Sequence, residues 1–341
     1  MTKKEWKRGF LSSGFPLEFE TAKILVKNRF MFKPNYCYQR VETGQTKDFS
    51  VDLYGNLLFP TSNPDKITAS LELLIECKYR TPNKIWLFLP DVNVPDLPLG
   101  DGLTIRAIDD FSFCRVLDMP LYHFTASMPL CYKGTEIDLS SSTAYDSEIR
   151  HGISQLQYAL PRLITENILQ QASSHPENIV PFFVLPILVT TAELRVLRQG
   201  MTLAKVEGTR ILADIAQKVP YLTLFNSFGE DFVAHAKRQF KELANIGDYK
   251  NVTDIEKRLR TSEIYKDIKK MSDSDIRKLL GTVHEFDLPS SVGKALAKGE
   301  NHKLSVFCTQ FLVCSFEALP EMLNCVKQVI RASLRKRKSF E

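Results

Sequence analysis

The sequence lacks the features of a membrane-spanning or an exported protein. Its longest apolar stretch, Ile179–Val189, has 11 residues and contains two prolines, whereas a transmembrane helix needs about 20 apolar residues. The N-terminal segment MTKKEWKRGF is basic, but no apolar run of signal-peptide length follows it. We therefore expect neither insertion into a membrane nor export.

Cysteine pairs and a nucleotide-binding loop are missing as well. The seven cysteines are scattered and form no Cys-x-x-Cys pair, which argues against a zinc ribbon and a thioredoxin-type site. A reduced, cytoplasmic environment is the plain expectation. No Gly-x-x-x-x-Gly-Lys-Ser/Thr loop occurs, so any NTP-driven motor would have to be another chain.

The overall composition is that of an ordinary globular protein. Of 341 residues, 44% are hydrophobic and 25% are charged, which excludes a disordered, collagen-like or coiled-coil chain. The net charge of +5 is unevenly distributed, because residues 1–170 carry 19 basic and 20 acidic side chains and residues 171–341 carry 26 and 20. If nucleic acid is the partner, its phosphates should therefore be contacted mainly by the second half.

The spacing of apolar residues predicts an α/β protein in which a mixed sheet is flanked by helices, with a largely helical C-terminal region. Residues 252–299 are lysine-rich and are expected to be mostly helical. Other helices are expected over Leu17–Phe30, Ser147–Gln170, Glu230–Ala244 and from Pro320 into the sequence LRKRK, and strands over 35–42, Phe49–Phe59, Leu71–Tyr79, 85–89, 180–191, 219–226 and 303–313.

The length fits one large domain or two ordinary ones, at about 150 residues per domain. We expect residues 1–170 to form a core. Residues 171–341 would extend its sheet and add a basic helical region, either within the same domain or as a second one.

The segment around residues 48–78 contains the chemically informative residues. Glu76 and Lys78 lie two apart in the apolar run LELLIECKY, so on a strand both point to one face and Cys77 points to the other. Two such charges are expensive to bury unless they are paired or bind a cation. With Asp52 on the preceding strand, the carboxylates would suit a hard divalent ion such as Mg²⁺.

Asp52, followed after 23 residues by Glu76-x-Lys78, resembles the core motif of the PD-(D/E)xK nucleases, the superfamily of many restriction endonucleases. The helix Gly14-Phe15-Pro16-Leu17-Glu18, the strand Ile85-Trp86-Leu87-Phe88 and the segment Gln155-Leu156-Gln157-Tyr158 are also similar to elements of that superfamily. Val51 replaces the usual proline, and the Gln155–Tyr158 spacing is one residue shorter than in RecB-like nucleases. The resemblance covers about residues 14–165.

The resemblance implies a restriction-endonuclease-like mixed sheet flanked by helices, a metal cofactor and a role for each residue. Asp52, Glu76 and the backbone carbonyl of Cys77 would hold Mg²⁺, for which Mn²⁺ could substitute, and Lys78 would orient or deprotonate the attacking water. Glu18 would bind a second metal ion or its water shell. Gln155 would orient the phosphate backbone or the strand that carries the site.

Several alternatives remain open from the sequence. Asp48 competes with Asp52 for the metal, and Glu20 competes with Glu18. The charged residues on the strands could also form an ordinary cross-strand salt bridge on a solvated face. His151 lies one turn before Gln155 and could approach the site, but a lone histidine on a helix is more often a surface or boundary residue. The basic residues expected either to contact DNA phosphates or to lie on solvated surfaces are Lys237, Arg238, Lys241, Arg335, Lys336 and Arg337.

The expected function is that of a Mg²⁺-dependent deoxyribonuclease, with restriction or anti-phage defence as the role that the resemblance suggests and repair or recombination next. A catalytically silent nuclease-like domain that binds nucleic acid or a partner protein is the alternative. DNA is the expected substrate, and a partner protein of the defence or repair system or a second copy of the chain are possible partners.

Overall fold

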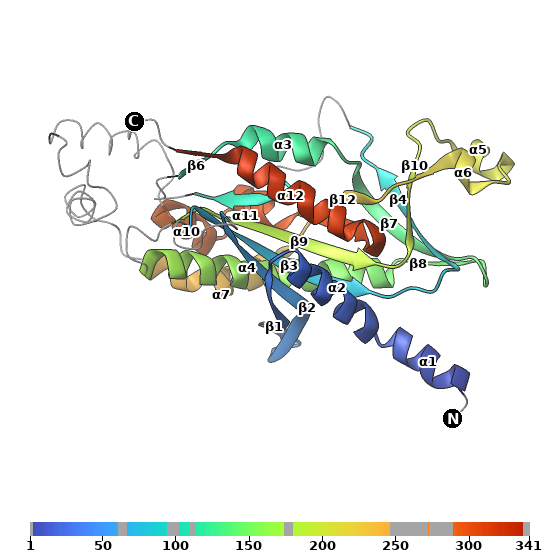
Figure 1. Ribbon diagram of the computed structural model, residues 1–341, viewed down its shortest axis with the longest axis horizontal. Helices are drawn as coiled ribbons and strands as arrows, with labels where there is room; N and C mark the ends of the chain where they lie inside the picture. The colour runs from blue at the N-terminus through green and yellow to red at the C-terminus, as the bar shows by residue number, and fades with distance from the viewer. Residues whose placement is uncertain are drawn as a thin grey trace.

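The protein is a mixed β-sheet with helices on both faces (Figure 1). The computed structural model describes residues 3–60, 67–93, 102–109, 114–173, 180–245, 272 and 289–336. In spatial order, the strands of the sheet are β1 (Met31–Glu42), β2 (Gln45–Phe59), β3 (Ala69–Lys78), β9 (Phe182–Thr190), β13 (Gln310–Ser315), β12 (Tyr221–Phe225), β7 (Leu130–Asp138), β4 (Lys84–Pro90), β10 (Glu193–Leu197) and β11 (Ala216–Lys218).

Shorter strands complete this arrangement. β5 (Arg106–Ile108) pairs with β9, and β8 (Thr143–Tyr145) pairs with β7. β14 (Leu334–Lys336) and β6 (Cys114–Val116) form a separate two-stranded sheet. The expectation of a mixed α/β sheet flanked by helices is thus confirmed.

Two layers of helices cover the sheet, and each has its own apolar core. On one face lie α4 (Ser147–Ser173), α7 (Glu230–Phe240), α10 (Pro289–Lys298) and α11 (Asn301–Cys308), with the short helix η3 (Lys241–Asn245). On the other face lie α2 (Phe15–Lys27), α3 (Asp118–Ala126) and α12 (Leu319–Ser333). The remaining helices of the described residues are α1 (Lys3–Ser12), α5 (Leu203–Gly208), α6 (Leu212–Ile215) and η5 (Phe316–Ala318).

The central strand β9 is buried on both faces along its whole length. It runs parallel to β3 on one side and to β13 on the other. A strand covered on both faces reads as a continuous apolar run, which is why the sequence FFVLPILVT contains no alternation of polar and apolar residues. The residues of β9 alternate between the two apolar cores and so join the two helical layers.

Helix α4 covers the part of the sheet that carries the candidate site. Its apolar residues recur at helical spacing and lie in one core with the sheet. They comprise Ile149, Ile153, Leu156, Leu160, Leu163 and Ile164, all of which are buried. The helix predicted over residues 147–170 is confirmed.

The structure corrects two expectations in the C-terminal part. Residues 303–308 belong to helix α11, and the strand begins only at Gln310, because Leu304, Phe307 and Cys308 are buried at helical spacing. Helix α12 ends at Ser333, and the basic sequence after it pairs with β6.

The second half of the chain supplies β9, β12 and β13 to the middle of the sheet, and a strand was expected near each of them. Of the segment 252–299, only residue 272 and the part from Pro289 onward lie within the described residues, and there α10 is helical. Within the described ranges, no helix combines the length and apolar character needed to cross a membrane.

We predict that Leu160→Ala in α4 lowers the free energy of unfolding by about 2–5 kcal/mol, because it leaves a cavity in a closely packed core. The measurement is urea unfolding followed by circular dichroism. Arg162→Ala, two residues along the same helix, is the control. It removes an exposed i,i+4 pair with Glu166 and should cost no more than about 0.5 kcal/mol. Equal losses in both variants would contradict this assignment of the core.

Candidate active site

The site is built where β2 and β3 separate. Their antiparallel pairing runs from Phe59 opposite Ala69 as far as Leu53 opposite Ile75 and ends there. At the next position the Asp52 side chain takes over, since its Oδ2 accepts a hydrogen bond of 2.7 Å from the backbone N–H of Cys77. A carboxylate thus replaces the partner strand and fixes Asp52 against β3.

The pairing of β2 with its other neighbour, β1, is also interrupted at Asp52. In the pairing of β1 with β2, Pro34 lies opposite Leu53 and Tyr36 lies opposite Val51. The intervening Asn35 has a positive φ of 54°, a conformation that asparagine tolerates better than most residues. Asp52 therefore lies at a local irregularity between two regular stretches of strand.

β3 presents Glu76 and Lys78 to the layer of α4, while Cys77 faces the layer of α2. Lys78 Nζ donates to Glu76 Oε1 at 2.8 Å, and their side chains are only 14% and 2% exposed. Cys77 Sγ donates to Thr21 Oγ1 of α2 at 3.7 Å. The alternation predicted for this strand is thus present, and its pair of charges is buried.

Gln155 of α4 connects the two strands of the site. Its Nε2 donates to the Ser50 carbonyl of β2 at 3.1 Å, and its Oε1 accepts from Lys78 Nζ at 3.5 Å. One turn earlier, a Cβ on Gly152 would lie 2.7 Å from Leu188 Cδ1 and 3.4 Å from Lys78 Cε. The glycine therefore allows α4 to approach β3 closely at the lysine.

Glu18 of α2 belongs to the same electrostatic group. Burial raises its pKa, the charge of Asp52 raises it further, and Lys78 lowers it. The competing Glu20 is exposed and pairs with Lys23 at 2.8 Å. Asp48, which competed with Asp52, is exposed and accepts a hydrogen bond from Gln39 at 3.2 Å. Of each pair, the structure places Glu18 and Asp52 at the site.

The carboxylates hold more negative charge than Lys78 alone compensates. Burial raises the pKa of Glu76 to about 7, and Asp52 adds to this increase despite the opposing Lys78. Burial also raises the pKa of Asp52, against the Cys77 N–H and Lys78. Within the described residues, Glu76 Oε2 is buried and has no hydrogen-bond partner. A cation at this oxygen would remove both penalties.

The candidate site offers a divalent metal ion only a few protein ligands. No three His, Cys, Asp or Glu side chains in the described part of the chain form a group that could hold an ion by themselves. The oxygens available are those of the Asp52 carboxylate, the unpartnered oxygen of Glu76 and the backbone carbonyl of Cys77. All are hard oxygen ligands, and Mg²⁺ is usually bound by one or two carboxylates with water completing its shell.

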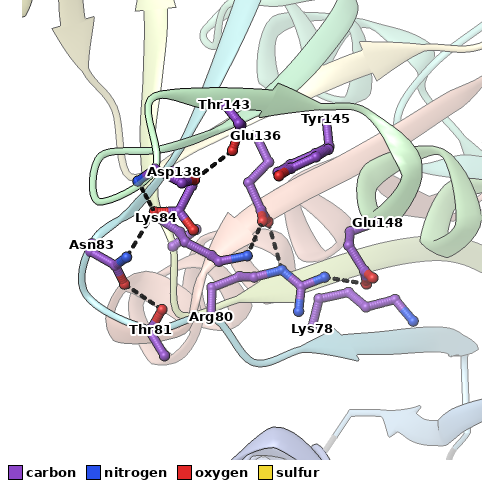
Figure 2. A network of polar contacts seen from close by, with 12 residues as sticks. Lys78, Arg80, Thr81, Asn83, Lys84, Glu136, Asp138, Thr143, Tyr145 and Glu148 are labelled. Carbon is purple, nitrogen blue, oxygen red and sulfur yellow. Dashed lines mark hydrogen bonds and ion pairs between the residues drawn. The ribbon is translucent and has the colours of Figure 1, made fainter.

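A second polar cluster, which the sequence did not indicate, continues the line of charged residues after Lys78 (Figure 2). Arg80 lies between two carboxylates, with its Nε 2.6 Å from Glu136 and its Nη2 paired with Glu148 of α4. Glu136 also accepts hydrogen bonds from Lys84 at 2.6 Å and Trp86 at 2.9 Å. Although burial raises its pKa, these neighbours hold it below the usual value.

This group of Arg80, Lys84, Trp86, Glu136 and Glu148, here called the Arg80 cluster, connects the first turn of α4 to the end of β3. Glu148, His151 and Gln155 follow at three- and four-residue spacing, so they share the face of α4 that looks toward Lys78. Burial and Lys78 lower the pKa of His151, while Glu148 and Asp52 raise it. From the sequence, a surface or boundary position was favoured for His151 over a place at the site. His151 is exposed but lies within electrostatic range of the site, and its spacing from Gln155 was the available indication.

The basic residues expected to contact phosphates lie on other elements. Lys237 and Arg238 are on α7 and Lys241 begins η3, and all three are exposed. Arg335 and Lys336 are in β14, and Arg337 lies outside the described residues. The site itself is surrounded by β2, β3, α2 and the first half of α4. Lys237, Arg238 and Lys241 therefore lie on elements other than those that carry the carboxylates.

Comparison of the chain with models of protein families, with curated proteins and with solved structures finds no match. The resemblance to the PD-(D/E)xK nucleases thus depends on the residues of this chain alone. What the geometry adds is that Glu18, Asp52, Glu76, Lys78 and Gln155 come from four separate elements and meet in one place.

We predict that the metal-free protein loses stability as the pH rises from about 4.5 to 7. A carboxyl whose pKa is higher in the folded state holds more protons when folded, so folding becomes less favourable as the proton is lost. For Glu76 the pKa rise to about 7 corresponds to about 3 kcal/mol across this range. The free energy of unfolding would be measured by urea titration in EDTA at several pH values.

Glu76→Gln should flatten this pH dependence, whereas Glu20→Gln, at an exposed position on α2, should leave it unchanged. The same slope in Glu76→Gln and in the unmodified protein would show that Glu76 titrates normally.

Proposed function

We propose that the protein is a Mg²⁺-dependent deoxyribonuclease of the PD-(D/E)xK type, with the restriction-endonuclease-like arrangement of strands that the type implies. The observation that carries this proposal is the buried Glu76–Lys78 pair beside Asp52, with one Glu76 oxygen unpartnered. A merely structural ion pair would be expected to use all of its buried oxygens.

Asp52 and Glu76, with the backbone carbonyl of Cys77, are the residues that would hold Mg²⁺. When bound, the ion would lower the pKa of a water molecule and neutralise charge on the scissile phosphate. The hydrogen bond from the Cys77 N–H keeps Asp52 oriented toward β3, so the carboxylate needs little rearrangement to act as a ligand.

Lys78 is held from two sides in a position suited to act on the attacking water. Glu76 Oε1 at 2.8 Å and Gln155 Oε1 at 3.5 Å both accept from its ammonium. From there Lys78 would orient or deprotonate the water and stabilise the negative charge that develops on the pentacovalent phosphate. Gln155 acts through Lys78 and through its bond to Ser50, and is therefore a positioning residue.

Glu18 would hold water or a second ion on the side of α2. Its raised pKa, which burial and Asp52 cause, is consistent with a carboxylate that lacks a cation of its own. The biological role suggested by the resemblance is restriction or phage defence, with repair or recombination as the alternative.

We predict that the purified protein cleaves DNA in Mg²⁺ or Mn²⁺ and that EDTA abolishes the cleavage. Asp52→Asn and Lys78→Ala should each reduce the single-turnover rate at least about 100-fold, because the first weakens metal binding and the second removes a cation from the developing negative charge. Gln155→Ala should have a smaller effect, since it only orients Lys78. Cleavage would be followed on supercoiled plasmid and on end-labelled single and double strands.

Asp48→Asn is the matched control, since it changes a carboxylate four residues from Asp52 on the same strand that lies exposed to solvent. It should retain full activity. Undiminished cleavage by both Asp52→Asn and Lys78→Ala would refute the site. Binding of nucleic acid or of a partner protein without cleavage in either metal would favour the catalytically silent alternative.

A further inference from the structure

The N-terminal helices carry a row of exposed aromatic side chains next to the candidate active site. Trp6 and Phe10 of α1 are 52% and 51% exposed, and Phe15 and Phe19 of α2 are 64% and 66% exposed. We call these four residues the aromatic face. A soluble protein seldom leaves so many large aromatic rings in water without a partner for them.

The aromatic face is placed outward by the way in which α1 leaves the body of the protein. Figure 1 shows α1 at the lower right, beyond the end of α2 and away from the sheet. The rings of Trp6 and Phe10 lie side by side, with their centroids 6.4 Å apart. An isolated helix of ten residues is marginal in water, so α1 would gain stability from a ligand along this face.

Gly14 connects the aromatic face to the catalytic carboxylates. It joins α1 to α2 with a φ of +84°, and a Cβ there would lie 3.3 Å from Glu18 Oε1. The same turn of α2 therefore presents Glu18 toward Asp52 and Phe15 and Phe19 toward solvent. A DNA strand bound at these carboxylates could therefore also contact the aromatic face.

Helix α1 adds positive charge to the aromatic face. Lys7 and Arg8 are exposed on α1 between Trp6 and Phe10. On α2, Lys23 Nζ lies 5.4 Å from the centre of the Phe19 ring and pairs with Glu20 at 2.8 Å. Aromatic rings interleaved with cations are the combination by which proteins bind single-stranded nucleic acid, because bases stack on the rings and phosphates contact the cations.

We propose that the aromatic face, with Lys7 and Arg8, binds a single-stranded DNA segment that flanks the phosphodiester at Asp52, Glu76 and Lys78. The inference rests on the proposed function, since it takes DNA as the substrate. A single strand is specified because duplex bases are stacked on each other and cannot stack on protein rings. The protein would then prefer DNA with an unpaired tail, flap or gap over fully paired duplex.

A second copy of the chain fits this surface less well. A symmetric dimer formed through α1 would place the same patch against itself, so Lys7 and Arg8 of one copy would face the like charges of the other. Like charges brought together across an interface cost several kcal/mol. The cations that disfavour self-association favour a polyanion.

Intrinsic fluorescence provides a direct test, because the chain has two tryptophans and the other one, Trp86, is fully buried. The full chain would be titrated in EDTA with oligo(dT) and with a blunt duplex of equal length. Oligo(dT) should quench the fluorescence of Trp6, the duplex should not, and Trp6→Phe should abolish the quenching. Lowering the salt concentration should strengthen binding, and Lys7→Ala/Arg8→Ala should reduce this salt dependence.

Binding measured by anisotropy of labelled oligo(dT) separates stacking from folding. Trp6→Ala/Phe10→Ala should weaken binding at least about tenfold. Tyr122→Ala on α3, a ring as exposed as that of Trp6, should leave it unchanged. Circular dichroism would confirm that both variants are folded.

The possible results separate this inference from the nuclease proposal. Cleavage of DNA without quenching of Trp6 would overturn the inference alone, and quenching without cleavage would overturn the nuclease alone. Equal quenching by duplex would refute the preference for a single strand. Protection of Trp6 from acrylamide that rises with protein concentration in the absence of DNA would show instead that a second copy covers the aromatic face.

Discussion

The hydrogen bond from the Cys77 N–H to Asp52 is the interaction on which the site depends. It satisfies a backbone group of β3 at the point where the pairing with β2 ends, so the two strands can separate without an unpaired buried donor. The separation leaves room for the side chains of Glu76 and Lys78 under α4. Asp52 therefore has two roles, since it closes the β-ladder and supplies a carboxylate to the site.

Charge balance explains why this arrangement is suited to a cation. Three carboxyl groups, those of Glu18, Asp52 and Glu76, have raised pKa values, and in each case burial is the largest cause. Lys78 is the cation that lowers all three. Arg80 cannot compensate them, because Glu136 and Glu148 already pair with it. The protein thus accepts a cost in stability here, which is characteristic of a functional site.

The sequence predicted the elements that have strong local patterns. α2, β2, β3, β4 and α4 were expected within a few residues of their bounds, because their apolar residues follow the period of a helix or strand. Contacts between distant segments could not be predicted in this way. The Arg80 cluster joins residues 80, 136 and 148, the strand partner of the residues after Ser333 is β6, and the aromatic face depends on the direction in which α1 leaves α2. Each of these features results from tertiary packing, which the local pattern of a single sequence does not reveal.

The position of β9 has a consequence for how the molecule can be divided. Every residue of the candidate site lies before residue 156, yet the strand that carries Glu76 and Lys78 pairs from Ser70 to Lys78 with residues 182–190. Thr190 also donates a hydrogen bond to the Lys78 carbonyl at 2.9 Å. A fragment ending near residue 170 would expose the edge of β3 and a wide apolar surface to solvent. Such an exposed strand edge promotes edge-to-edge aggregation. The residues of the candidate site all lie between positions 18 and 155, but the sheet that holds them includes strands from the second half of the chain.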